Sequence, residues 1–466
     1  MLFLFMAAAC AVNPVTGKRE LSLISEKEEI ALGQKTDTEI QGQYGFYADS
    51  SLNEYVRKVG MQLSPHTHRP NLSYHFVVID TPVVNAFAAP GGYIYVTRGI
   101  LAMMNSEAEL AAVLGHELGH VNARHSVKKL SELYLVQLGM AVGSALSKTF
   151  AKLSGLSSVG IQLLFLKFSR DDEREADALG VEYARKGSYS PAEMVSFFSS
   201  LQKFGDLSGG KSLPGFLSTH PLTSERIQNV KSMLKAEDGL LSVERDAYLD
   251  HLENIVFGDD PRQGYAEANT FYHPEMTFSF SFPQDWNLEN TPNRIVLKSK
   301  DGNAALVIQA EKSQENLRDY AQKKVATMEG RKFIAEEELS INSMPVYQQL
   351  CDIIQEKEEN LRLRLSFLKK GPYIFTFSAF STSSKFSEHD PQFGATVGSF
   401  NELREKERLY LQPKRLKLIR ANGKNNLRQI FQDSGMKEDS WPTMAILNAL
   451  ELDQIPKENE LIKITR

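Results

Sequence analysis

The protein has 466 residues, a formal net charge of −5 at pH 7 and 42% hydrophobic residues. This hydrophobic fraction is ordinary for folded globular proteins. The slightly acidic balance excludes a dominant nucleic-acid-binding surface, so we expect no nucleic-acid partner. The length predicts about three domains.

The first ten residues form a short apolar run that ends in three alanines and Cys10. This run resembles the end of a bacterial lipoprotein signal. The resemblance implies a lipid on Cys10, membrane attachment and a place in the periplasm, at the outer membrane more than the inner one. The run is short and lacks a basic segment, so an incidental hydrophobic start on a soluble protein is the alternative. Cys351 is then expected as a buried thiol.

Two further segments bear on the first half of the chain. Residues Tyr93–Val96 alternate in the manner of a strand. This strand is either a sheet edge that can hold an extended polypeptide by backbone pairing, or an ordinary structural strand. The most apolar stretch, residues 133–146, is too short to span a membrane, and we expect most of it to be helical.

A helix is predicted around an HExxH motif, after a capping-box pattern at Ser106–Glu109. His116 and His120 are four residues apart, so both imidazoles leave one helix face and can bind one metal ion. Glu117 lies beside that line, where it can contact a metal-bound water. The alternative is a pair of ordinary polar residues on a half-buried helix.

A third metal ligand is expected in the segment Ser169–Asp177, because a catalytic zinc site takes three protein ligands. Glu173 and Asp177 share a helix face, so Glu173 can bind the metal while Asp177 accepts a hydrogen bond from a ligand histidine. A solvated charged helix is the alternative. The apolar sequence on both sides favours a packed position, where a carboxylate needs a partner.

These two motifs, together with the segment Ser218–Ile227, resemble peptidase family 48 of the metallopeptidases. This gluzincin family includes the CAAX prenyl protease and the heat-shock membrane protease. The resemblance covers about residues 13–235. It implies one zinc ion per chain.

The family pattern assigns a role to each matched residue. His116, His120 and Glu173 match the zinc ligands, Glu117 matches the general base, and Asp177 matches the orienting acid.

Two further residues, His220 and Arg226, match a histidine and an arginine near the site of the family. His220 either stabilises the oxyanion of the tetrahedral intermediate or occupies the open zinc position and holds the enzyme off. A turn or capping role before Pro221 is the alternative. His125 follows the HExxH motif at a spacing that suits no ligand, and we expect it on the surface.

The resemblance implies a zinc endopeptidase that cleaves proteins of the bacterial cell envelope, in protein quality control. Two alternatives stay open. The chain could act mainly as a chaperone or assembly factor, or as a peptidoglycan-associated adaptor with little proteolysis.

The second half changes character after a turn-rich stretch at residues 257–264. Period-two patterns predict strands near residues 276–282, 295–297, 305–309, 361–367 and 373–377, and helices are expected at 316–328 and 391–399. The segment Phe280–Trp286 weakly resembles PsbP-like domains. No catalytic cluster is visible, so a binding or spacer role is expected.

The last segment has a predicted βααβ order, with strands near Leu416–Arg420 and Leu461–Ile464. This order resembles a LysM domain, which implies binding to peptidoglycan. The usual glycine-aspartate-threonine is replaced by Gly423–Asn426, so the segment either binds glycan or only caps the protein.

Together these patterns predict an α+β multidomain protein. A lipoprotein-type signal remnant at residues 1–10 precedes a mostly helical zincin-type peptidase domain with a small sheet over residues 11–258. An α/β sandwich-like domain follows over residues 265–408, and a small βααβ domain ends the chain over residues 412–466.

Overall fold

The computed structural model of the protein describes residues 10–139, 167–207, 215–326, 328–355 and 359–466. These residues form two compact units. The first contains the described residues up to 259 together with 414–466, and the second contains those from 260 to 413. Helices and strands occur in both, so the predicted α+β multidomain class is confirmed at that level. Residues 1–9 of the predicted signal remnant lie outside the described residues.

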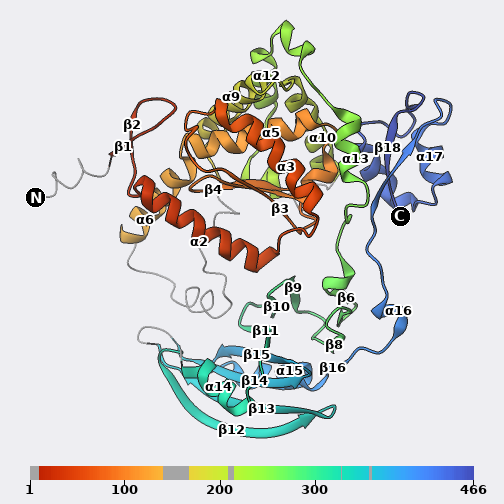
Figure 1. The fold of residues 1–466 in the computed structure, drawn as a ribbon. Coiled ribbons are helices and arrows are strands. Elements are labelled where there is room, and N and C mark those ends of the chain that lie inside the picture. Colours follow the sequence, from red (N-terminus) through yellow and green to blue (C-terminus); the bar gives the residue numbers. More distant parts are fainter. Residues whose placement is uncertain (1–9, 140–166, 208–214, 327, 356–358) are drawn as a thin grey trace, which may run out of the picture. The chain divides into compact units, whose positions relative to one another are not determined.

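The first unit is mostly helical (Figure 1). Its elements are β1 (Cys10–Val12), β2 (Arg19–Leu21), α2 (Glu26–Tyr44), α3 (Ser50–Leu63), η1 (Ser64–His66), β3 (His75–Ile79), β4 (Ala86–Ala89), β5 (Tyr93–Thr97), α4 (Arg98–Met103), α5 (Glu107–Asn122), α6 (His125–Gly139), α9 (Arg170–Lys186), α10 (Ala192–Leu207), α11 (Gly215–Thr219), α12 (Ser224–Met233), η2 (Ala236–Leu240), α13 (Arg245–Leu252), β17 (Leu416–Arg420), α17 (Leu427–Asp433), η4 (Glu438–Ser440), α18 (Trp441–Leu447) and β18 (Leu461–Thr465).

Within the described residues, no helix combines the length and the apolar character that crossing a membrane requires. Helix α6 includes residues 133–139 of the apolar stretch at 133–146, as predicted. Residues 140–146 of that stretch lie outside the described residues.

A three-stranded sheet lies between α5 on one face and α2 on the other (Figure 1). The strand order is β3-β5-β4, with β5 parallel to β3 and antiparallel to β4. Ile94 and Val96 of β5 pack in the core that contains α5. Tyr93 and Tyr95 pack with Ile40 of α2. Both faces of the sheet are therefore buried.

The strand Tyr93–Val96 is not a sheet edge, so that reading of its sequence is wrong and the structural reading is right. It belongs to β5, which has hydrogen-bonded neighbours on both sides. The alternation of aromatic and aliphatic residues reflects two different buried faces, and the Tyr95 hydroxyl is satisfied by donating to Asp37 over 2.7 Å. The edge strand of this sheet that contacts α5 is β4.

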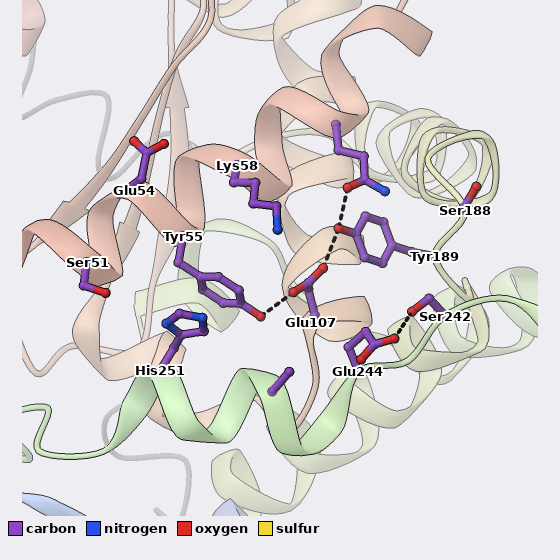
Figure 2. Close-up of a pocket in the computed structure, with 12 residues that line it drawn as sticks. Ser51, Glu54, Tyr55, Lys58, Glu107, Ser188, Tyr189, Ser242, Glu244 and His251 are labelled. Atoms are coloured by element: carbon purple, nitrogen blue, oxygen red, sulfur yellow. Dashed lines mark hydrogen bonds between the residues drawn. The ribbon is translucent and has the colours of Figure 1, made fainter.

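Helix α5 is held at its first turn by its cap and by a tyrosine network. The Ser106 hydroxyl accepts from the Glu109 amide, as predicted, while the Glu109 carboxylate accepts from the Asn105 amide. Figure 2 shows Tyr55 and Tyr189 on either side of Glu107, to which they donate over 2.5 and 2.6 Å. A hollow of about 590 Å³ opens beside this network. None of the residues that line it belongs to the HExxH motif.

Glycines let α5 and α9 approach closely. A Cβ on Gly119 would lie 3.0 Å from the Cα and 3.1 Å from the carbonyl oxygen of Ala176, and a Cβ on Gly180 would lie 3.0 Å from the His116 amide nitrogen. Larger residues at these positions would push the helices apart. The spacing that brings Glu173 to the HExxH motif therefore depends on these glycines.

Residues 414–466 have the predicted βααβ order and pack into the first unit instead of forming a separate one. Strand β17 pairs with β18 and also bonds to the segment before it, through the Asn254 amide and the Leu416 carbonyl over 2.8 Å. Lys463 of β18 is fully buried and donates to the carbonyl oxygens of Ala102 and Met104, each over 2.9 Å. The C-terminal segment thus completes the end of α4.

The second unit is built on antiparallel strands. Its elements are η3 (Pro261–Gln263), β6 (Tyr265–Glu267), β7 (Thr270–His273), β8 (Phe278–Ser281), β9 (Asn287–Thr291), β10 (Arg294–Lys298), β11 (Ala304–Lys312), α14 (Leu317–Ala326), β12 (Arg331–Ile341), β13 (Met344–Ile353), β14 (Leu361–Lys370), β15 (Tyr373–Thr382), α15 (Phe386–Gly398), β16 (Asn401–Glu402) and α16 (Lys406–Leu409).

The larger sheet has the order β12-β13-β14-β15-β11-β10-β9, and a smaller one has the order β16-β8-β7-β6. Helix α14 covers one face of the larger sheet with Tyr320 and Val325, and Cys351 is buried in that layer as predicted. Helix α15 and the smaller sheet cover the other face through Phe393 and Phe278. The predicted strands and both predicted helices are present, whereas β6, β7, β9, β12, β13 and β16 were not predicted.

Candidate active site

Four metal-capable side chains from three helical regions meet in the first unit. His116 and His120 extend from α5, Glu173 from α9, and His220 from the turn after α11. One donor atom from each lies within 4.8 Å of every other, and all four residues are buried. The helical spacing of the HExxH motif and the α5–α9 contact together produce this convergence.

The distances between these donor atoms suit a small tetrahedral cation. His116 Nε2 lies 3.1 Å from His120 Nε2 and 3.3 Å from His220 Nδ1. Glu173 Oε1 lies 2.9 Å from His220 Nδ1 and 3.5 Å from His120 Nε2. Zinc bonds of about 2.0–2.2 Å place tetrahedral ligand atoms roughly 3.3–3.6 Å apart. Three nitrogens and one carboxylate oxygen at these separations fit zinc.

Asp177 lies one helical turn beyond Glu173 on α9, with its Oδ1 at 3.0 Å from His116 Nδ1. Arg226 of α12 binds both Asp177 oxygens, over 2.7 and 2.6 Å, and reaches Glu173 Oε2 over 2.7 Å. Burial would raise the pKa of Asp177, but the Arg226 hydrogen bond and His116 outweigh it and lower that pKa. The Arg226 guanidinium thereby compensates two buried carboxylates.

Glu117 lies beside the donor cluster with its side chain fully buried. Its Oε1 is 3.8 Å from His220 Nε2, and neither carboxylate oxygen has a hydrogen-bond partner among the described residues. Burial raises the pKa of Glu117, and the nearby His220 and His116 oppose that rise. A buried carboxylate is costly unless its site supplies a cation or a donor. This orphaned group supports a cation next to Glu117.

The pKa values of two histidines of the cluster shift in opposite directions. It lowers the pKa of His120 well below the usual value, and this favours the neutral imidazole that binds metals. For His220, burial would also lower the pKa, but the carboxylates of Glu173 and Glu117 outweigh it and raise that pKa. The His220 ring stacks on Phe216 with centroids 4.7 Å apart, which holds it against the cluster.

His125, expected on the surface, is buried behind His120, so that expectation is wrong. Its Nδ1 lies 2.9 Å from His120 Nδ1, and its Nε2 lies 3.1 Å from Glu175 Oε2. Arg124 adopts a left-handed conformation at φ 56° and ends the helix, so the spacing from the motif no longer follows helical periodicity. No pattern in the sequence signalled this contact.

The structure thus brings all seven predicted site residues into one buried cluster. It also adds Phe168, whose ring stacks on that of His120 with centroids 4.1 Å apart. The side chain of Cys10, the predicted lipid attachment point, lies outside the described side chains.

Comparison with known proteins is consistent with this cluster. The model of peptidase family M48 matches residues 50–234. The beta-barrel assembly-enhancing protease of Escherichia coli K12 is 27% identical over 228 residues, which cover 47% of this chain and 46% of that protein. The mitochondrial metalloendopeptidase OMA1 of Schizosaccharomyces pombe is 31% identical over 227 residues, covering 47% and 65%.

The chain spans about half the length of the first of these relatives. The metalloprotease YcaL of Escherichia coli K12 is 33% identical over 187 residues, which cover 40% of this chain and 71% of that protein. Helices α5 and α9, with every predicted metal ligand, fall within the family match. The chain belongs to peptidase family M48.

Proposed function

We propose that the protein is a zinc-dependent endopeptidase, with zinc held by His116, His120 and Glu173. The observation that carries the proposal is the buried tetrahedron of donors next to the unpartnered carboxylate of Glu117. When bound, zinc supplies a Lewis acid that polarises a peptide carbonyl and lowers the pKa of its water toward neutrality. The family of the chain supports the same reaction.

Glu117 is the proposed general base and acid. Its carboxylate takes the proton of the attacking water and then delivers it to the leaving amine. Burial raises the pKa of Glu117, and a raised pKa brings the group closer to the value that suits proton transfer near neutral pH. Asp177 Oδ1 lies 3.0 Å from His116 Nδ1, close enough to orient that ring, while Arg226 holds Asp177.

The geometry of Arg226 favours an orienting role over a direct role in catalysis. Its guanidinium already contacts Asp177, Glu173 and the Pro221 carbonyl. Few of its N–H groups remain to bind a developing oxyanion.

His220 holds the fourth corner of the donor tetrahedron. We propose that this arrangement is a resting state in which the His220 imidazole excludes substrate, and that the side chain moves away before hydrolysis. An oxyanion-binding role in the active state is compatible with that movement. Replacing His220 with alanine separates the two roles, because a pure gate predicts faster hydrolysis and a pure oxyanion donor predicts slower hydrolysis.

Substrate is proposed to bind in extended form along β4, the edge strand of the first-unit sheet next to α5. An edge strand can pair with an extended peptide through its backbone, and because all four β4 residues are buried, the residues that cover them must move aside before substrate binds. This mode reads backbone geometry more than side chains, so loose sequence specificity is expected.

A role in the bacterial envelope is a further part of the proposal. One relative carries the name beta-barrel assembly-enhancing protease, which supports substrates among envelope proteins. The short apolar run before Cys10 supports a lipid anchor in the periplasm. We also propose that residues 412–466 bind peptidoglycan, and their βααβ order supports this. The alternative function is an assembly factor with little proteolysis, and the words assembly-enhancing in the same relative's name are its support.

The decisive experiment compares unaltered protein with Glu117→Gln. We expect about one zinc per chain in both, as measured by atomic emission. We expect cleavage of unfolded casein only in the unaltered protein, or in a His220→Ala background if the resting state blocks it. Full casein cleavage by Glu117→Gln would refute the proposed chemistry. Complete rescue of a deletion strain by Glu117→Gln would favour the assembly-factor alternative.

A further inference from the structure

A second buried histidine stands behind the proposed zinc ligand His120. His125 is the first residue of α6 and is only 2% exposed. Its Nδ1 faces His120 Nδ1 at 2.9 Å, and its Nε2 faces Glu175 Oε2 of α9 at 3.1 Å. Asp172 lies further away, with Oδ1 at 3.6 Å from the same Nε2. His120, His125 and Glu175 form one line from the cluster to the side of α9, and Asp172 lies beside its end.

The protons along this line follow from the chemistry of imidazole. His120 Nε2 points at the donor cluster, 3.1 Å from His116 Nε2, so its lone pair must be free to bind a cation. The Nδ1 of His120 then carries the hydrogen and donates to His125 Nδ1. Neutral His125 consequently carries its hydrogen on Nε2, which donates to Glu175. Each donor in the line meets one acceptor.

We propose that His125 and Glu175 are positioning residues that fix the tautomer and the ring orientation of His120. This inference rests on the proposed function, because it treats His120 as a zinc ligand. It makes the two ligand histidines unequal. His116 is oriented directly by the carboxylate of Asp177, whereas His120 is oriented by a neutral ring that a carboxylate holds in turn.

The contacts from His120 through His125 to Glu175, here called the relay, also explain how α9 can hold both ligand histidines in place. Residues two apart on a helix point to different sides, so Glu173 faces the cluster while Glu175 faces α6. The helix that supplies the carboxylate ligand therefore also anchors the ring behind His120. A shift of α9 would disturb both contacts together.

The competing explanation for the burial of His125 is a structural role, in which it only links helix α6 to helix α9. The same pair of helices has another tie, in which Lys128 Nζ lies 3.2 Å from Asp172 Oδ1. Lys128 makes no contact with His120 among the described residues. Lys128→Met is therefore a matched control, because it removes the second contact between α6 and α9 and leaves the contacts of His125 with His120 and Glu175 in place.

The test measures zinc affinity of the full chain by competition with a chromophoric chelator, and the visible spectrum of the cobalt-substituted protein. His125→Leu removes the acceptor, and we expect zinc affinity to fall about 10- to 100-fold with a changed cobalt spectrum. His125→Asn places an amide oxygen where it can accept from His120 Nδ1–H, so it should recover most of the affinity. Glu175→Ala should fall between these two variants, and Lys128→Met should match the unaltered protein.

The outcomes separate this inference from the proposed function. If the unaltered protein binds no zinc, the proposed function itself fails. If it binds zinc and His125→Leu keeps the same affinity and cobalt spectrum, only the relay is overturned. Equal losses in His125→Leu, His125→Asn and Lys128→Met would show a structural tie and would also overturn it. Circular dichroism of the metal-free variants checks that each one folds.

Discussion

The buried centres of the two units differ in chemical character: the first contains a group of charged side chains, and the second is apolar. In the first unit, Glu117, Glu173, Asp177 and Arg226 are buried together around one point. In the second unit, the core is built from aromatic and aliphatic side chains such as those of Phe278. Among the residues described between 260 and 413, no group of histidine, cysteine and acidic side chains has metal-binding geometry.

From this contrast we expect the chemistry of the chain in the first unit. Burying charge costs free energy, which apolar packing does not. The first unit buries Glu117, Glu173, Asp177 and Arg226 in one mutually compensating cluster. Within the described residues of the second unit, no histidine, cysteine and acidic side chains form a comparable metal-binding group. We therefore expect the second unit to bind a partner or to act as a spacer. Equivalent changes in the two units should have unequal effects.

The largest expected difference comes from removing one histidine in each unit. His116→Phe deletes a proposed ligand nitrogen, so we expect loss of bound zinc and of hydrolysis while the fold is retained. His273→Phe in β7 should leave both unchanged. Atomic emission and casein cleavage measure the two properties. Stoichiometric zinc in His116→Phe would contradict the comparison.

The next difference concerns one arginine in each unit. Arg226→Met leaves Asp177 and Glu173 buried without their compensating cation, and we expect a loss of about 3–5 kcal/mol in unfolding free energy. Arg364 binds Asp390 by two hydrogen bonds near the surface of the second unit, with both side chains more than a fifth exposed. Arg364→Met should cost about 1 kcal/mol or less.

Chemical denaturation, read from the fluorescence of the tryptophan in each unit, compares these two arginine variants. Trp441 lies in the first unit and Trp286 in the second. Equal losses would remove the distinction between a buried charge cluster and surface ion pairs.

Local periodicity explains which parts of the site could be predicted. His116 and His120, and likewise Glu173 and Asp177, are four residues apart on helices, so their shared faces follow from the sequence alone. His125 could not be placed, because the left-handed turn at Arg124 carries it back to His120. Its environment depends on a chain reversal that its spacing does not show.

Two features of the fold could not be predicted because they depend on partners distant in sequence. The pattern of Tyr93–Val96 shows a strand but not its place in the sheet, which β3 and β4 determine. Strand β12 is exposed over most of its length and includes Glu336–Glu338, so it lacks the alternation that marks a strand. Its pairing with β13 gives it its structure.

Acidification should affect the second unit through His273. Burial lowers the pKa of His273 to about 4, from an ordinary value of 6.5. Since the folded form resists protonation and the unfolded form does not, stability is full above pH 6.5 and falls as the pH drops toward 4. At pH 5 the unfolding free energy of the second unit is expected to be about 2 kcal/mol lower than at pH 7.

Urea denaturation at pH 7 and pH 5, read from Trp286 fluorescence, measures this effect. His273→Phe should lose the dependence that His273 causes. If His273→Phe and the unaltered protein weaken by equal amounts at pH 5, other groups are responsible and the assignment to His273 is wrong.

The last comparison uses one glycine in a helix of each unit. Gly119 of α5 has the backbone of Ala176 at 3.0 Å from the position of a Cβ, whereas Gly394 of α15 has no heavy atom within 4 Å. Gly119→Ala should force α5 and α9 apart and cost about 1–3 kcal/mol, with weaker zinc binding because Glu173 moves with α9. Gly394→Ala meets no steric cost and restricts the unfolded chain, so it should stabilise the second unit by about 0.5–1 kcal/mol. Thermal unfolding of both variants measures the signs of the two changes in stability. A stabilising Gly119→Ala would mean that α5 and α9 have room between them, and the close approach that brings Glu173 to the histidines would then need another cause.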